Sequence, residues 1–202
     1  TYGRVSRYGI VAYSSSLDQC GPITQNVEDA AILYDIIAGY DEKDSTSANI
    51  DYKKVTPNLD SNKKFTITVI DNFVTQASSE IQTAFNKTVE LLKEQGHKIV
   101  HANMIDTNKI ISTYYIISAA EASANLARFD GVRFGARKGD GNLKDMYVDT
   151  KTQGFGYEVK KRIMLGSFVL SSGYYDAYYI KAQKVRSIIK AEFDKIFESS
   201  DL

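Results

Sequence analysis

Arg162 lies in the run KKRIMLG, residues 160–166, and has the most clearly defined chemistry of any side chain in the sequence. A guanidinium is planar and presents its N–H donors in a rigid fork, so it can bind a carboxylate through two parallel hydrogen bonds. Glu158 stands four residues earlier, which on a helix would instead give an exposed ion pair of little energetic weight. The pattern leaves both interpretations open: a clamp for a substrate carboxylate, or a surface pair.

The pair Tyr114-Tyr115 is the second candidate for contact with a ligand. Either ring could line a pocket, or could lie in a core on a helix rich in isoleucine. The chain holds 14 tyrosines and no tryptophan, and another cluster lies within residues 174–179. Because tyrosine packs as an apolar body with a polar tip, we expect both clusters to face a core, with their hydroxyl groups bonded to the backbone.

Hydrolysis of an amide needs an activated nucleophile, a proton relay and an oxyanion hole. The serine runs at 14–16 and 171–172 are the most obvious hydroxyl candidates, and the second precedes Gly173 at an expected helix break. Neither run has a lysine or histidine beside it, and serines at such positions usually cap helices. Cys20 is interpreted as a small buried residue. We therefore assign no catalytic residue within this chain.

His97 and His101 have the spacing of two metal ligands on one face of a helix. The surrounding sequence favours a strand, on which four residues span ~13 Å, too far for a shared ion. The segment 135–141 combines glycines with basic residues, as phosphate-binding loops do. It lacks Gly-Lys-Ser/Thr and follows a helix, however. We therefore expect this chain to bind no metal and no cofactor.

Composition excludes several classes of function. Lys and Arg total 25, as do Asp and Glu, so no overall basic field draws the chain to nucleic acid or a membrane surface. No apolar run approaches the ~20 residues of a membrane span. A single cysteine cannot form an internal disulfide, which fits a reducing compartment and makes the cytoplasm the default. The charged residues Arg128, Asp130 and Arg133 are expected to form a structural ion-pair network.

A strand, a helix and a second strand are predicted in succession. Residues 65–70 are rich in β-branched side chains, and residues 97–104 follow the same pattern. Between them, Ser79 and Gln82 resemble a capping box that opens a helix ending at Gly96. This order predicts a parallel pair of strands with a right-handed crossover.

The rest of the chain is predicted to be mainly helical, which gives a mixed α/β class. Residues 41–64 are polar and are expected to form a surface loop, and residues 131–142 a mobile one. Small side chains at 118–124 would let another backbone come close. The other helices are expected from Asn26 to Gly39, from Asp106 through Ala124, near Asp145, from Tyr157 to Ser171 and from Tyr174 to Phe197.

Three stretches carry a family resemblance: TYYIISAAEASANLARFDGVRFGAR (113–137), VKKRIMLGSFVLSSGYYDAYY (159–179) and TYGRVSRYGIVAYSSSLDQCGPITQNVEDAA (1–31). They resemble the amidase signature family, and within it the glutaminase subunits of tRNA-dependent amidotransferases. Weaker similarity extends to Phe197. The resemblance implies an α/β fold class in which residues 1–202 are part of the amidase-signature fold, with a mixed central sheet covered by helices.

The resemblance also implies a function and two site residues. Family members of this kind hydrolyse glutamine through an acyl-enzyme on a serine, using a Ser–Ser–Lys relay. In the family, the arginine of the pattern Arg-Ile-x-Leu-Gly holds the α-carboxylate of glutamine, and Arg162 matches it. A tyrosine of the Tyr-Tyr pair lines the glutamine pocket, and the register favours Tyr114 over Tyr115.

The implied partners are the B and C subunits of the amidotransferase. The ammonia passes to the B subunit, which uses ATP and Mg²⁺ to convert Glu-tRNA(Gln) to Gln-tRNA(Gln) and holds most of the charged tRNA. No cofactor is implied for this chain itself. Cytoplasmic location and the absence of a membrane partner complete the expectation.

The match further implies a domain truncated at both ends. In the family, the catalytic lysine and both serines lie upstream of the segment that matches Tyr2, and an acidic residue that binds the α-amino group lies downstream of Leu202. We therefore expect the isolated chain to be inactive and its sheet to have unpaired edges, so that it self-associates. Two alternatives remain open: a stand-alone amidase for small amides, and a non-catalytic scaffold or subunit-contact fragment.

Overall fold

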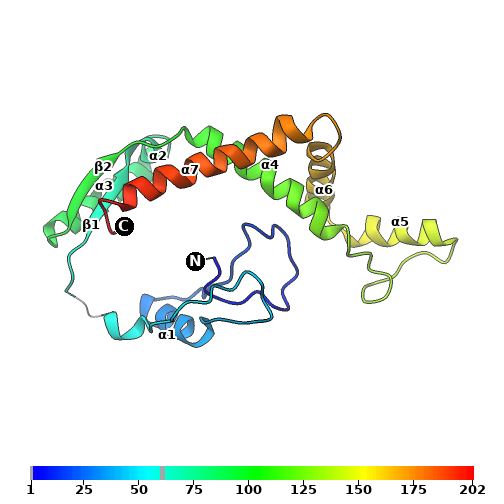
Figure 1. The fold of residues 1–202 in the computed structure, drawn as a ribbon, viewed down its shortest axis with the longest axis horizontal. Helices are drawn as coiled ribbons and strands as arrows, with labels where there is room; N and C mark the ends of the chain where they lie inside the picture. Colours follow the sequence, from blue (N-terminus) through cyan, green and yellow to red (C-terminus); the bar gives the residue numbers. More distant parts are fainter. Residues whose placement is uncertain (1, 60–61) are drawn as a thin grey trace. The chain divides into compact units, whose positions relative to one another are not determined.

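The computed structural model describes residues 2–59 and 62–202, which divide into two compact units. Unit 1 combines the described part of residues 1–61 with residues 118–170, and unit 2 combines residues 62–117 with residues 171–202. Because the colours of Figure 1 follow the sequence, each unit combines two separate colour ranges there. The boundary at residue 117 falls inside a single helix, α4 (Thr107–Leu126), so that helix contributes residues to both units.

Unit 2 contains the predicted strand, helix and strand. β1 (Thr66–Ile70) and β2 (Lys98–Ala102) pair in parallel, from Thr66 opposite Lys98 to Ile70 opposite Ala102. α2 (Asp71–Val74) and α3 (Ser79–Glu94) connect them. The α/β class and the parallel pair are confirmed, since side-chain periodicity switches from two to 3.6 and back along this segment.

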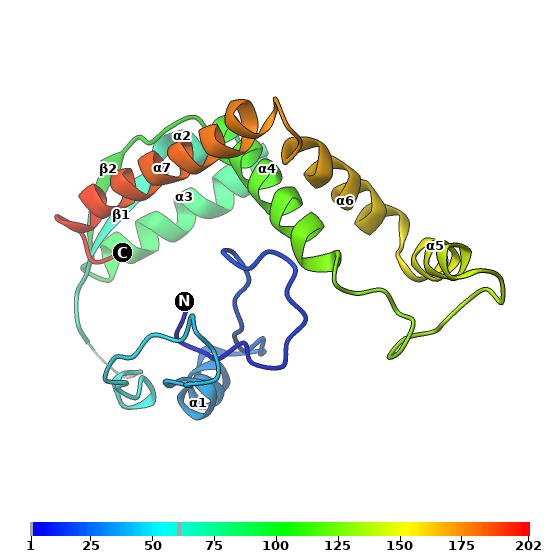
Figure 2. The same ribbon diagram turned by 45° about the vertical axis from the view of Figure 1, so that its right-hand side comes forward.

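Leu202 lies beside the other edge of β1, and the C-terminus is next to this strand in both ribbon views (Figures 1 and 2). The Thr68 N–H donates to the Leu202 carbonyl (2.8 Å), while the Leu202 and Asp201 N–H groups donate to the Thr66 carbonyl (3.3 and 2.8 Å). Bonds from one residue to both neighbours of Ile67 are the pattern of a parallel ladder. The expectation of a bare edge is therefore wrong for this side of β1.

Unit 1 is built on helices. α4 enters it at Ser118, and α5 (Leu143–Gly154) and α6 (Tyr157–Val169) follow. The short side chains of α4 are almost fully buried here, including those of Ala119 and Ala122. As predicted for such a run, another backbone approaches it closely, that of α6.

The N-terminal part of unit 1 carries one helix, α1 (Val27–Ile37), capped by Asn26, whose side chain accepts the Asp29 N–H (2.7 Å). The loop that follows includes a single 3₁₀ turn, η1 (Thr56–Asn58). Both the helix start and the loop agree with the sequence prediction, because the cap and the polar run are local signals.

Three local predictions need correction. α3 is capped by Ser78 rather than Ser79, and Gln82 donates instead to the carbonyl groups of Thr75 and Ala77 (3.2 and 2.9 Å), so the capping box is wrong. α2 was not expected. The predicted helix 174–197 is a π-helical turn, η2 (Asp176–Ile180), followed by α7 (Lys181–Phe197).

Candidate functional site

Arg162 lies on α6, one turn after Glu158. Its Nε donates to Glu158 Oε1 at 3.0 Å, and the Arg162 side chain is 24% exposed against 58% for Glu158. The glutamate precedes the arginine at a spacing of four, which is the favourable order for a helical ion pair. The pair foreseen from the spacing is therefore present. Binding of a substrate carboxylate by Arg162 stays a prediction.

Tyr13 is the second group beside the arginine, and no pattern in the sequence pointed to it. Its hydroxyl oxygen is buried and has no partner among the described residues that meets conventional hydrogen-bond distance and angle. Interaction with the Tyr13 hydroxyl raises the pKa of Arg162; desolvation opposes this effect, and Glu158 adds to it. Both neighbours therefore favour the charged form of Arg162.

The serine run after Tyr13 is bound to α4. Ser14 Oγ donates to Glu121 Oε2 (2.7 Å), and the Ser16 N–H and Oγ donate to the two oxygens of the same carboxylate (2.9 and 2.5 Å). Asn125 Nδ2 donates to Ser15 Oγ at 2.9 Å. These hydrogen bonds hold the serine run against α4: the hydroxyl groups of Ser14 and Ser16 contact a carboxylate, and that of Ser15 contacts an amide.

A close helix crossing joins α4 to α6. A Cβ added at Gly166 would lie 2.6 Å from both the Ala119 carbonyl carbon and Ser123 Cβ, and closer still to the Ala119 oxygen. Beside this contact, the hydroxyl groups of Ser123 and Ser167 share a hydrogen bond of 2.9 Å. The crossing fixes α6, and with it Arg162, relative to the helix that also holds the serine run.

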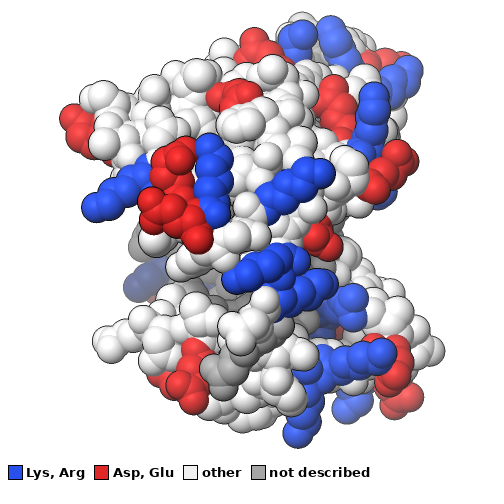
Figure 3. Space-filling model, turned by 90° about the vertical axis from the view of Figure 1, so that its left-hand side faces the viewer, with Lys and Arg blue, Asp and Glu red and all other residues white. Residues whose placement is uncertain are grey.

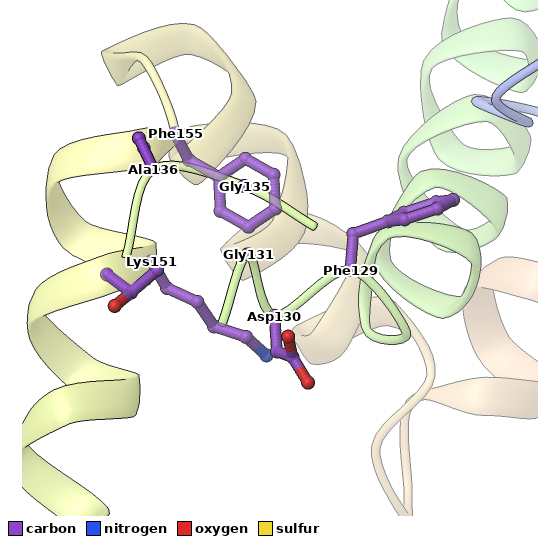
Figure 4. Close-up of a pocket in the computed structure, with 9 residues that line it drawn as sticks. Phe129, Asp130, Gly131, Gly135, Ala136, Lys151 and Phe155 are labelled. Carbon is purple, nitrogen blue, oxygen red and sulfur yellow. The ribbon is translucent and has the colours of Figure 1, made fainter. Parts of the chain in front are cut away.

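Two cavities of unit 1 are lined in part by residues of α5. One, of 390 Å³, lies among α4, α5 and α6. The other, of 290 Å³, is lined by Phe129, Phe155 and the glycine-rich segment, together with Asp130 and Lys151 (Figure 4). Arg162 lines neither cavity. The residues around the 390 Å³ cavity are Ser123, Leu126, Ala127, Lys151, Thr152, Phe155, Lys160, Ile163, Met164 and Ser167.

The glycine-rich segment is tied to α5. The buried Thr150 hydroxyl accepts the Lys138 N–H and donates to the Lys138 carbonyl (3.0 and 3.1 Å). A Cβ at Gly135 would lie 2.8 Å from Gly131 Cα, so two backbones meet where side chains would not fit. The glycines of this segment allow the backbone to pack closely. Their arrangement does not indicate a phosphate-binding site.

The ion-pair network expected of Arg128, Asp130 and Arg133 is wrong. Within residues 2–59 and 62–202, none of the three lies in an ion pair. Asp130 Oδ1 accepts the Val132 N–H at 2.8 Å, and Arg128 Nη2 donates to Asn125 Oδ1 at 3.3 Å. Local turn geometry and a neighbouring amide satisfy these groups instead.

Tyr114 lies on the part of α4 that belongs to unit 2. Its ring contacts that of Tyr115 edge to face, with centroids 5.3 Å apart. The two tyrosines are 46% and 48% exposed, and Tyr174, Tyr175 and Tyr178 are more than 40% exposed as well. The expectation that these clusters face a core is wrong. Tyr114 and Arg162 belong to different units, and the roles predicted for them remain predictions.

The remaining candidates have separate surroundings. His97 Nδ1 accepts the Phe65 N–H at 3.1 Å, whereas His101 Nδ1 lies 2.8 Å from Asp71 Oδ1. Across the described ranges, no three His, Cys, Asp or Glu side chains are grouped as metal ligands. Cys20 is a partly exposed free thiol rather than a buried residue. The Ser171 carbonyl accepts the N–H groups of the next helical turn.

On the face drawn in Figure 3, basic and acidic side chains are mixed, as expected for a chain with equal numbers of each. Figure 3 shows Lys and Arg interspersed with Asp and Glu over the visible face. In the part of the chain that the structure describes, no helix combines the length and apolar character needed to cross a membrane.

Residues 1–202 match the protein family described as Amidase. The chain is 77% identical over 202 residues to the A subunit of glutamyl-tRNA(Gln) amidotransferase from Aliarcobacter butzleri, and 62% identical over 203 residues to its Campylobacter jejuni counterpart. Each alignment covers all of this chain and 45% of the relative. The chain therefore spans less than half the length of these curated relatives.

Solved structures of related proteins also match the chain. The crystal structure of the glutamyl-tRNA(Gln) amidotransferase A subunit from Thermotoga maritima matches with a TM-score of 0.72 and 34% identity, over 100% of this chain and 39% of that one. A bacterial aryl acylamidase of the amidase signature family matches with a TM-score of 0.68 and 18% identity, over 98% and 39%. The second likeness is evidence of a shared fold alone.

Proposed function

The chain belongs to the amidase family, and on that basis we propose that it is part of the glutaminase component, the A subunit, of a glutamyl-tRNA(Gln) amidotransferase. The observation that carries the proposal is 77% identity to a protein of that name along the whole chain. The complete protein hydrolyses glutamine, and the ammonia serves to convert Glu-tRNA(Gln) to Gln-tRNA(Gln).

In this proposal the chain supplies binding groups rather than the nucleophile. Arg162 holds the α-carboxylate of glutamine, and Tyr114 is the second proposed substrate-binding residue of the complete protein. No residue of the chain is assigned to ATP or Mg²⁺, whose use falls to the B subunit, together with most of the tRNA contacts. The C subunit completes the complex, and the cytoplasm is its proposed location.

The test compares two nitrogen sources in the assembled complex, with Arg162 changed in the full-length protein. Loss of a charge-assisted bidentate contact is worth roughly 2 to 4 kcal/mol, or about 30- to 1000-fold in kcat/KM for glutamine. Arg162→Lys keeps the charge but loses the fork, so it is expected to be impaired as well. Tyr114→Phe and Tyr115→Phe, compared side by side, report which ring contributes.

External ammonium bypasses the glutaminase pocket and is the control. Arg162→Ala is expected to leave ammonium-dependent tRNA amidation nearly unchanged. If both reactions fell together, Arg162 would be a structural residue and the carboxylate assignment would be wrong. The isolated 202-residue chain, which carries no proposed nucleophile, is expected to release no ammonia from glutamine.

A further inference from the structure

We propose that Glu158 and Tyr13 are positioning residues for Arg162: together they fix the orientation in which its guanidinium meets the substrate carboxylate. The inference rests on the proposed function, because it takes Arg162 as the carboxylate-binding group. It adds two residues, one from the N-terminal segment and one from α6, that act on the substrate only through the arginine.

Glu158 determines which edge of the guanidinium faces the substrate. Its Oε1 accepts from Arg162 Nε at 3.0 Å. A carboxylate can bind an arginine in parallel fashion either along the Nε edge or along the edge formed by the two Nη atoms. With Glu158 on Nε, the substrate is expected to use the second edge. The ion pair thus fixes the plane of the guanidinium and the direction in which its two Nη atoms point.

Tyr13 is the second group that interacts with the guanidinium. Its hydroxyl is buried, and beside the arginine it is the one side-chain oxygen of the described residues that burial leaves without a conventional hydrogen bond. A buried polar group of this kind is costly unless a nearby donor compensates it. We assign that role to the guanidinium of Arg162, with which the Tyr13 hydroxyl interacts.

Both positioning groups stand on a rigid base. The Tyr13 N–H donates to Asp18 Oδ2 at 2.8 Å, and Asn125 Nδ2 donates to the Tyr13 carbonyl at 3.1 Å, so the backbone of this residue is held on both sides. The crossing at Gly166 holds α6 against the same helix that carries Asn125. Binding groups supported in this way keep the geometry that bidentate recognition needs.

Thermal unfolding distinguishes a role of Glu158 in orienting Arg162 from a role in stabilising the fold. Glu158 is more than half exposed, and an ion pair at such a site contributes almost nothing to folding. Its removal should therefore leave the thermal midpoint nearly unchanged. An effect on glutamine binding without an effect on stability would identify orientation of the arginine as its role.

The experiment uses the full-length protein in the assembled complex, with Tyr13→Phe, Glu158→Gln and Glu158→Ala, and measures KM and kcat for glutamine and for ammonium. We expect KM for glutamine to rise roughly tenfold in Tyr13→Phe and Glu158→Ala, with smaller changes in kcat, as for supporting groups behind a binding residue. Glu158→Gln should recover part of the loss because its amide oxygen can still accept from Nε. Ammonium kinetics should not change.

Matched controls are Tyr157→Phe and Lys161→Gln, two exposed positions of α6 that should leave both KM values unchanged. If Arg162→Lys raises KM for glutamine while the Tyr13 and Glu158 variants do not, the positioning proposal is wrong and the proposed function stands. If none of these variants, including Arg162→Lys, changes KM for glutamine, both the positioning proposal and the assignment of Arg162 to the substrate carboxylate are wrong. Equal losses with glutamine and ammonium would assign Tyr13 and Glu158 a structural role and overturn the proposal.

Discussion

At the scale of single residues, Asp35 orders a loop through one carboxylate. Its two oxygens accept the Tyr52 hydroxyl (2.6 Å), the N–H groups of Val55 and Thr56 (2.8 and 3.0 Å) and the Thr56 hydroxyl. Burial alone would raise the pKa of Asp35, but these hydrogen bonds outweigh it and lower the pKa. Burial and the carboxylate also raise the pKa of Tyr52 to about 12.

The first prediction concerns the pH dependence of this anchor. Because the pKa of Asp35 is lower in the folded chain than its ordinary value of about 3.9, its stabilising effect is complete above that value and is lost as pH falls through the lowered pKa. Asp35→Asn should lower the thermal midpoint at neutral pH. The difference from the unchanged chain should shrink progressively below about pH 4, where the unfolded chain takes up the proton first, and should be lost only below the lowered pKa, where the folded carboxylate is protonated too.

The same substitution should speed hydrogen exchange at the Val55 and Thr56 amides, which donate to the carboxylate. Asp51→Asn is the control, since Asp51 is an exposed carboxylate of the same loop and should have no effect. A midpoint difference that stayed constant across the acid range would show that Asp35 acts through packing rather than through its charge.

Residue-scale prediction succeeded where partners are close in sequence. The Arg162–Glu158 pair follows from a spacing of four on a helix, and Asn26 from its place before an apolar stripe. Tyr13 beside Arg162, and Glu121 behind the serine run, could not be found in this way. Their contacts depend on how separate segments fold together, and no local pattern encodes that.

At the scale of elements, long periodic segments were predicted well and short irregular ones were not. α3 follows from a repeating apolar pattern, and α4 follows from a long run of apolar and small side chains. The four-residue α2 and the π-helical turn before α7 have too few residues to set a period. Gly173, with φ of +87°, does mark the break before that turn, as its conformational freedom predicts.

The second prediction is that Gly166→Ala separates α6 from α4. The new methyl group would meet the Ala119 carbonyl at the crossing, and neither backbone can move without loss of packing. Overpacking of this kind costs about 1 to 3 kcal/mol, and a backbone contact places the substitution at the upper end. Urea unfolding of the two chains measures the change in the free energy of unfolding.

Gly154→Ala provides the matched control, because a Cβ there meets no atom within 4 Å. Alanine has the higher helix propensity, so this variant should be neutral or slightly more stable. Equal midpoints for the Gly166 and Gly154 variants would mean that the crossing adapts and that Gly166 is not required for it.

At the scale of the whole molecule, the chain exposes large apolar side chains and a strand edge. Met164 and Tyr157 on α6 are 74% and 80% exposed, although both are large and apolar in body. Among the described residues, no strand pairs with the second edge of β2. Sheet edges and apolar helix faces of this kind promote contact between copies.

The third prediction is concentration-dependent self-association of the 202-residue chain in the micromolar range. Light scattering coupled to gel filtration should show a mass that rises with loading concentration. Met164→Lys should reduce the effect if the α6 face takes part, whereas Lys161→Gln should not. A constant monomer mass at all concentrations would show that these surfaces are better protected than the described contacts indicate.

The alternation of segments between the two units also sets an order of folding during synthesis. The N-terminal segment of unit 1 cannot complete its contacts until residues 118–170 have left the ribosome, and β1 waits for Asp201 and Leu202. Contacts between such distant segments slow folding, because the loop between them must close first. Until residues 201 and 202 are synthesised, a nascent chain of this topology exposes helix faces and an edge of β1, and surfaces of this kind are prone to aggregate.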